Sequence, residues 1–214
     1  YSHRRILKIM SAQPKFSPEE LLEMENASPI RHEYIGGRLY AMAGGSPDHA
    51  AISANLAGAI ASRLRGKPCR PSSSDQRVRV TEKSQNWYYP DFLIKCPPFR
   101  FHPFDKTALL NPRAIFEVLS PATQEFDRTK KFDEYKQISE LTDYILVSTD
   151  AVRVEHFRRL DGSEWVQRVY TRREDVLRLE NFGVEAPLEE IYDGIALEAQ
   201  VVLPFDSEFL SPNG

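Results

Sequence analysis

Two segments decide the fold, Tyr88-Tyr89-Pro90-Asp91-Phe92-Leu93-Ile94 and Ala114-Ile115-Phe116-Glu117-Val118-Leu119. Both predict short strands, and each carries one acid, Asp91 or Glu117. A carboxylate inside an apolar strand is costly unless a cation or a hydrogen-bond network compensates it. Hard cations such as Mg²⁺ take oxygen ligands, often one or two carboxylates together with substrate phosphate. Two acids on neighbouring strands therefore predict a divalent metal site and indicate phosphodiester chemistry.

A lysine beside these acids is predicted on the following helix and not on the strand. Glu117 and Leu119 share one face of their strand, so the position where a strand lysine would stand is a leucine. Further along, Lys131 and Tyr135 are four residues apart and share a helix face with Asp127. We therefore expect Lys131 to reach back over the sheet towards Glu117.

The remaining patterns predict one mixed β-sheet with helices on its faces. The expected fold class is therefore α/β, with a mixed sheet as in α+β proteins. Capping signals at Ser17, Pro18 and Glu20 predict a helix over 16–24, and Ser46-Pro47 opens a long helix to about Arg65. Gly36-Gly37 supplies the turn of an N-terminal hairpin over 32–42. Further strands are predicted at 76–80, 88–95, 114–119 and 144–147, a C-terminal hairpin at 152–158 and 165–170, and helices from Thr123 or Asp127 to about Ile138 and from Ala186.

The amino-acid composition limits the classes of protein to which this chain can belong. The chain has 214 residues, 28% charged and 41% hydrophobic, and a formal net charge of −3. These values predict one globular domain over 16–200, a leader or tail over 1–15 and a C-terminal tail over 201–214, with no apolar run as long as a membrane span. Cys69 and Cys96 lack any metal-binding spacing, so we expect two buried thiols and a cytoplasmic protein.

The order of motifs along the chain resembles the Uma2 family, formerly known as DUF820, a branch of the PD-(D/E)XK nuclease-like fold. The matching segments span about residues 16 to 195. They are His32-Glu33-Tyr34-Ile35-x-Gly37-x-Leu39-Tyr40-x-Met42, Ser46-Pro47-x-His49, Ser74-Asp75, Tyr88-Tyr89-Pro90-Asp91, Glu117-Val118-Leu119-Ser120-Pro121-x-Thr123, Asp127-Arg128-x-x-Lys131-Phe132-x-x-Tyr135 and Tyr144-Ile145-Leu146-Val147. Two positions depart from the family's habit, because Gly36 and Lys130 stand where acids or Asn are common.

The resemblance implies a restriction-endonuclease-like core, a mixed sheet flanked by helices, with a metal-dependent nuclease site. Asp91 and Glu117 would ligate Mg²⁺ or Mn²⁺, and Glu33 would add a third carboxylate directly or through water. Lys131 would be the catalytic lysine that has migrated from the strand to the helix. The Val118 carbonyl is a further candidate ligand.

Three residues are candidates for supporting roles around that site. His49 is either a helix N-terminal residue satisfied by a carbonyl or a group that supports the metal ligands. Asp75 is either a turn acid or a support of the site, and Tyr135 is either a core residue or a wall of the site. Arg77, Arg79 and Lys95 lie near the relevant strands and are candidates for phosphate contacts.

Three functions are compatible with these residues. The first is an Mg²⁺-dependent DNA endonuclease that uses a metal-activated water. The second is a catalytically silent protein that keeps the nuclease fold for nucleic-acid binding or assembly, and the third is a hydrolase of a small phosphate ester. Zinc hydrolase chemistry is disfavoured because the sequence has no HExxH spacing. A homodimer is predicted from the small residues Ala50, Ala51, Ala54, Ala57 and Ala61 along the long helix.

Overall fold

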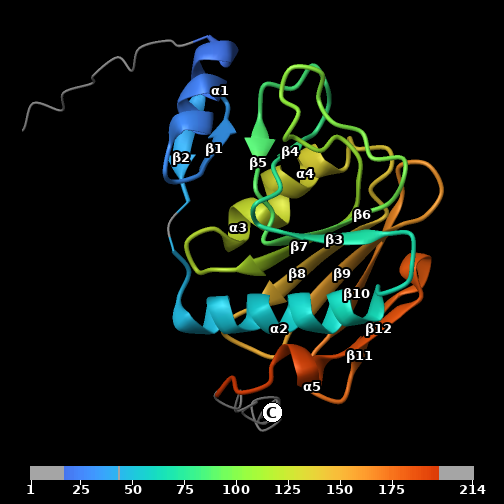
Figure 1. The fold of residues 1–214 in the computed structure, drawn as a ribbon. Helices are drawn as coiled ribbons and strands as arrows, with labels where there is room; N and C mark the ends of the chain where they lie inside the picture. The colour runs from blue at the N-terminus through green and yellow to red at the C-terminus, as the bar shows by residue number, and fades with distance from the viewer. Residues whose placement is uncertain (1–16, 43, 198–214) are drawn as a thin grey trace, which may run out of the picture.

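A mixed six-stranded sheet forms the centre of the molecule (Figure 1). The computed structural model describes residues 17–42 and 44–197, so the predicted N-terminal segment 1–15 and the whole predicted tail 201–214 lie outside it. The strand order is β10-β9-β8-β7-β6-β3, and only β7 and β8 run parallel to each other. The bounds are β3 Arg70–Ser73, β6 Phe92–Lys95, β7 Pro112–Leu119, β8 Asp143–Ser148, β9 Val154–Arg159 and β10 Trp165–Tyr170.

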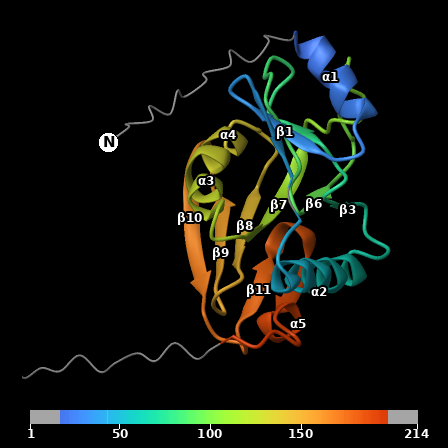
Figure 2. The ribbon, with the colours of Figure 1, turned by 90° about the vertical axis from the view of Figure 1, so that its left-hand side faces the viewer.

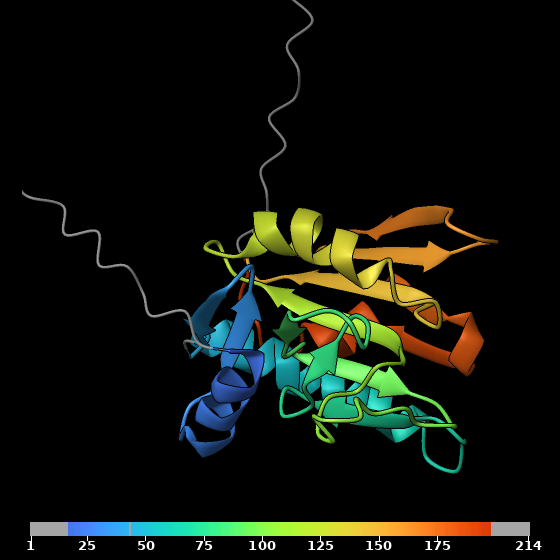
Figure 3. The same ribbon diagram turned by 90° about the horizontal axis from the view of Figure 1, so that it is seen from above.

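Helices cover both faces of this sheet (Figure 3). On one face α2, Pro47–Arg63, buries Ile52, Leu56 and Ile60 against Phe116 and Val118 of β7. On the other face lies a helical segment made of α3 Gln124–Phe126, the π-helical turn η1 Asp127–Lys131 and α4 Phe132–Tyr135. Its aromatic side chains pack with Ile115, Leu119, Tyr144 and Leu146. The alternation along β7 therefore directs Glu117 towards the face covered by α3–α4, as the sequence predicts.

A smaller sheet, with the order β2-β1-β5-β4, stands beside the central one. Its hairpin joins β1 His32–Ile35 to β2 Arg38–Ala41 through Gly36 and Gly37, which have φ angles of 56° and 87°. The other strands are β4 Val78–Arg79 and β5 Trp87–Tyr88. The capping box of α1, Pro18–Ala27, is also present, since Ser17 Oγ and the Glu20 carboxylate each accept the other residue's backbone N–H. The predicted hairpin and first helix are confirmed.

The C-terminal segments that follow the central sheet lie beside α2 (Figure 2). The β9–β10 hairpin is confirmed. A second hairpin, β11 Val176–Leu179 and β12 Val184–Pro187 with the 3₁₀ turn Glu180–Phe182 between its strands, is absent from the sequence prediction. The last helix, α5 Leu188–Ile191, begins two residues after the predicted start and packs against α2.

The predicted strand 88–95 is wrong as one strand. It forms two strands in two different sheets, β5 and β6, separated by Tyr89-Pro90-Asp91. Pro90 has no N–H to give to a ladder, so pairing cannot continue through it. The break is the point where Asp91 enters the site described below.

The prediction of two free thiols is also wrong, because Cys69 and Cys96 form a disulfide. Arg70 of β3 and Lys95 of β6 form the end pair of the antiparallel ladder, so the two cysteines face each other one step outside it. Their Cα atoms are 4.1 Å apart. Sequence spacing could not reveal this pairing, because β3 carries Pro71 and polar residues and does not look like a strand.

Two further expectations concern surfaces. No helix within residues 17–42 and 44–197 is both long and apolar enough to span a membrane. Along α2, Ala51 and Ala57 pack against the core, whereas Ala50 and Ala54 are exposed.

Candidate active site

Lys131 is surrounded by three carboxylates, two of them from distant parts of the chain. Its Nζ lies 2.9 Å from Glu117 Oε1 on β7, 3.2 Å from Glu33 Oε1 on β1 and 3.5 Å from Asp127 Oδ1 one turn earlier on η1. The Lys131 side chain is only 6% exposed and that of Glu117 only 5%. The helix lysine therefore reaches the strand acid, as the sequence predicts.

Aromatic packing fixes the helical segment that carries Lys131. The ring of Phe132 stacks on Tyr144 of β8, with centroids 4.7 Å apart and an angle of 6° between the planes. The Tyr144 hydroxyl donates a 2.9 Å hydrogen bond to the backbone carbonyl of Asp127. A π-helical turn inside an α-helix is a rare feature that often occurs at functional sites. Here it places both Asp127 and Lys131 against the sheet.

Asp91 joins the site from the break between β5 and β6. The β6–β7 register pairs Phe92 with Phe116, and one step further it brings Asp91 opposite Glu117. Asp91 Oδ2 accepts a 2.7 Å hydrogen bond from the Val118 backbone N–H. His49, at the start of α2, places its Nε2 3.5 Å from the same oxygen. The Asp91 hydrogen bond raises the pKa of His49, so the contact favours the protonated imidazole.

Burial and charge act together on the Glu117–Lys131 pair. Burial raises the pKa of the Glu117 carboxyl well above its ordinary value, and the Lys131 ammonium opposes this rise. Burial alone lowers the pKa of Lys131, but Glu117 and Glu33 outweigh it and hold that pKa well above the ordinary lysine value. Lys131 is therefore a fixed cation at neutral pH.

Glu33 and Tyr135 complete the surroundings of the pair. Glu33 Oε1 accepts a 3.1 Å hydrogen bond from the Tyr89 backbone N–H in addition to its contact with Lys131. The Tyr135 hydroxyl lies 3.5 Å from Glu117 Oε1, at the limit of a hydrogen bond. Of the predicted site residues, Glu33, Asp91, Glu117, Lys131, His49 and Tyr135 thus lie together. Asp127 lies in the same cluster. The sequence feature that indicates this is its spacing of four residues from Lys131.

The donor set is suited to a hard divalent cation with an incomplete protein shell. No group of three or more Asp, Glu, His or Cys side chains in the described part of the chain is arranged to enclose a metal ion. Asp91, directly before β6, and Glu117 on the adjacent strand β7 still provide two carboxylates next to the Val118 backbone. Mg²⁺ commonly binds through one or two carboxylates and keeps water and phosphate as its other ligands. The chemistry of these residues therefore fits Mg²⁺. Glu33 is already bound by Lys131 and by the Tyr89 N–H.

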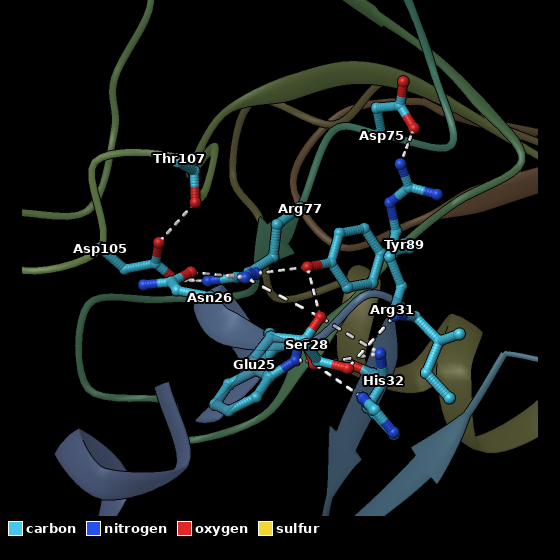
Figure 4. Close-up of polar contacts among 12 residues, drawn as sticks. Glu25, Asn26, Ser28, Arg31, His32, Asp75, Arg77, Tyr89, Asp105 and Thr107 are labelled. Carbon is cyan, nitrogen blue, oxygen red and sulfur yellow. Dashed lines mark hydrogen bonds and ion pairs between the residues drawn. The ribbon is translucent and has the colours of Figure 1, made fainter. Parts of the chain in front are cut away.

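Asp75 and the predicted phosphate-binding cations lie elsewhere. Asp75 forms an exposed ion pair with Arg31 (Figure 4). Arg77 and Arg79 are buried and face Asp105, at 2.8 Å and 3.5 Å, so the expectation of phosphate contacts by these arginines is wrong. Lys95 donates a 2.7 Å hydrogen bond to Gln76 Oε1.

Arg77 belongs to a buried polar network that sequence reasoning did not predict (Figure 4). The Tyr89 hydroxyl accepts a 2.8 Å hydrogen bond from Arg77 Nε and donates one of 2.9 Å to Glu25 Oε1. Glu25 also accepts the His32 backbone N–H at 3.1 Å. These bonds join α1 and β1 to Tyr89. Because the Tyr89 N–H binds Glu33, the network fixes the backbone that presents Glu33 to Lys131.

Comparison with known proteins places this chain in a family. The model of the Uma2 family, described as "Putative restriction endonuclease", matches residues 18–189. The uncharacterized protein slr1290 of Synechocystis is 35% identical over 184 residues, which cover 86% of this chain and 94% of that protein. The uncharacterized protein sll1609 of the same organism is 29% identical over 147 residues, 69% of this chain and 82% of that protein.

A solved structure shares the fold. It is the crystal structure of a "putative nuclease belonging to DUF820" from Anabaena variabilis, with a TM-score of 0.65 and 16% sequence identity. The similarity covers 83% of this chain and 97% of that one. The family model agrees with the family that the sequence motifs resemble, and the solved structure agrees with the fold. This chain belongs to the Uma2 family, the family described as "Putative restriction endonuclease".

Proposed function

We propose that the protein is an endonuclease that hydrolyses DNA phosphodiester bonds and depends on Mg²⁺, with Mn²⁺ as a substitute. The observation that carries this proposal is the buried Glu117–Lys131 pair with Asp91 directly before the adjacent strand β6. Three carboxylates, from Glu33, Glu117 and Asp127, surround the Lys131 ammonium, and the charge of a fourth, from Asp91, acts on Glu117. With these four acids ionised and Lys131 protonated, three negative charges are in excess; a protonated His49 leaves two, which a divalent cation would neutralise.

Stability alone gives no reason to keep such a cluster. Replacing a buried ion pair by apolar residues of similar volume is often neutral or stabilising. A protein that needed only the fold for binding or assembly would be free to fill this space with apolar side chains. The retained acids and the fixed lysine therefore favour catalysis over the silent alternative.

Each side chain has a distinct task in the proposed reaction. Asp91 and Glu117 would hold the Mg²⁺ ion, which when bound polarises the scissile phosphate and lowers the pKa of a water molecule. The Val118 N–H and His49 hold one oxygen of Asp91 and leave the other free to bind. Lys131 carries the positive charge that stabilises the developing charge on the phosphate. Glu33 and Asp127 keep Lys131 protonated and in place.

Cleavage of supercoiled plasmid and of end-labelled oligonucleotides tests this function. We expect nicking with Mg²⁺ or Mn²⁺, none with EDTA, and products with a 5′-phosphate. Asp91→Asn and Glu117→Gln should each lower the rate at least about 100-fold, a loss of roughly 2.7 kcal/mol of transition-state stabilisation. Asp161→Asn, at an exposed turn, is the matched control and should cleave like the wild type.

The outcomes separate the alternatives. Cleavage that persists in Asp91→Asn and Glu117→Gln would come from a contaminating enzyme and would refute the assignment. Metal-dependent release of phosphate from a small ester, without cleavage of polymer, would support the small-ester hydrolase. DNA binding without any cleavage would support the silent protein. The predicted homodimer is a separate expectation, and a monomer in light scattering would remove it.

A further inference from the structure

The hairpin face that carries Glu33 also presents two side chains without a structural role. In the β1–β2 register Glu33 is paired with Tyr40, and Ile35 with Arg38. Side chains of directly paired residues lie on the same face, roughly 4.5–5.5 Å apart at Cβ. Arg38 and Tyr40 therefore share the face of Glu33. This face is turned towards the site, since Glu33 contacts Lys131 and Ile35 packs against the core under α3–α4.

Tyr40 differs from the aromatic residues around it. Its side chain has no hydrogen-bond partner in the described structure, and the residue is 49% exposed. Tyr34, on the opposite face of the same hairpin, is 5% exposed and stacks on Trp87 with centroids 4.9 Å apart. The hairpin thus has its packing aromatic on one face and an unused aromatic ring on the other. Folding does not explain the second ring.

Arg38 adds a positive charge next to Tyr40. The two residues are two positions apart on β2, the outer strand of the small sheet, so both point the same way. Arg38 is exposed, and no ion pair or hydrogen bond of its side chain occurs within residues 17–42 and 44–197. An exposed aromatic ring beside an unpaired arginine is the chemistry that binds single-stranded nucleic acid, by stacking on bases and by contact with phosphates.

The site itself is recessed. The side chains of Glu117, Lys131, Glu33 and Asp91 are 5%, 6%, 16% and 19% exposed. Glu33 of the hairpin lies 3.2 Å from Lys131, so a phosphate bound at Lys131 would lie close to the hairpin. A flexible single strand can bend into such a position, whereas a base stacked inside a duplex offers no free face to a protein ring.

We propose that Tyr40 is a stacking platform for an unpaired base next to the scissile phosphate, with Arg38 as the contact to a neighbouring phosphate. This inference rests on the proposed nuclease function and specifies its substrate class as single-stranded or locally unpaired DNA. Stacking does not distinguish one base from another, so we expect a preference for single-stranded over double-stranded DNA and none for a particular sequence.

Binding without cleavage tests the inference apart from the reaction. Fluorescence anisotropy in EDTA compares a labelled oligo-dT strand, a strand of abasic residues of the same length and a duplex. Tyr40→Ala should weaken oligo-dT binding about 5- to 150-fold, the range for loss of one base–aromatic stack. Tyr40→Phe keeps the ring and should bind like the wild type. Phe104→Ala removes a ring that is 88% exposed on another loop, and should also bind like the wild type.

The abasic strand and the duplex show whether a change in affinity comes from base stacking or from charge. The abasic strand should bind wild type and Tyr40→Ala equally, whereas Arg38→Ala should weaken both strands and reduce the salt dependence of binding. Equal oligo-dT affinity of wild type and Tyr40→Ala, or tighter binding of the duplex than of oligo-dT, would overturn the proposal. Tyr40-dependent binding without cleavage in Mg²⁺ or Mn²⁺ would refute the nuclease function and leave this subsite in place.

Discussion

Replacing Lys131 by methionine should destabilise the metal-free protein strongly. The substitution keeps the volume of the side chain but removes the ammonium that lies within 3.5 Å of Glu33, Glu117 and Asp127. Breaking a buried ion pair by removing one partner costs about 3–5 kcal/mol, because the other charge stays buried without compensation. For a protein of this length the melting temperature should fall by about 6–20 °C.

Urea denaturation in EDTA, followed by circular dichroism, measures this free energy. Lys136→Met is the matched control, because Lys136 lies one turn later and its partner Asp133 is 69% exposed. Exposed pairs contribute about 0–1 kcal/mol, so the control should lose no more than that. The double variant Glu117→Gln, Lys131→Met should recover part of the loss, since it removes the most deeply buried charge. A Lys131→Met variant as stable as Lys136→Met would refute the reasoning.

The loss of folding stability caused by Lys131→Met should also depend on pH. Burial raises the folded-state pKa of Glu117 above its unfolded value near 4.5, so the folded state holds that proton more tightly. Stability then falls as the pH rises above the unfolded pKa, because ionisation of Glu117 is resisted only in the folded state. Without the lysine this penalty is uncompensated. The free-energy gap between wild type and variant should therefore be largest at pH 7–8 and shrink as the pH falls towards 4.5.

Three further predictions use other contacts of the structure. Asp91→Asn should lower the pKa of His49, because it removes the hydrogen bond that raises it, and an NMR titration of the imidazole would contradict this by showing no change. Replacing both Cys69 and Cys96 by alanine should cost about 3–4 kcal/mol in urea denaturation, from closure of a 27-residue loop, and free thiols in the unreduced protein would count against the bond. Arg77→Met should cost at most about 3–5 kcal/mol, because it breaks the buried pair with Asp105 and leaves that acid only Arg79 at 3.5 Å, and a loss below about 1 kcal/mol would show that the network is dispensable.

Local signals in the sequence predicted local structure well. The capping box of Ser17 and Glu20 and the two glycines of the β1–β2 turn each act within four residues, and both form as expected. The face of Glu117 followed from simple strand alternation. The approach of Lys131 followed from its helix spacing to Asp127 and Tyr135, although the wider π-helical turn between them has no recognisable pattern in the sequence.

Contacts between distant segments could not be predicted in this way. Glu25 and Arg77 are 52 positions apart, and each taken alone looks like an ordinary surface charge. Only the fold shows that Tyr89 lies between them and that both are buried. The same holds for the disulfide and for β11–β12. The family resemblance supplied the order of the site residues, but it did not reveal what holds the backbone of Glu33 in place.

The division of contacts around Glu117 decides which variants isolate catalysis from folding. Asp91 is held by the Val118 N–H and His49 on one side, whereas Lys131 is held by Glu33 and Asp127 on the other. Glu117 lies between the two groups and contacts Lys131 directly. An amide at Asp91 leaves the lysine and its carboxylates intact, so that variant should fold normally and still lose the oxygen charge that a metal needs. Substitutions at Lys131 disturb both properties, and a loss of cleavage there carries meaning only beside a measured free energy of unfolding.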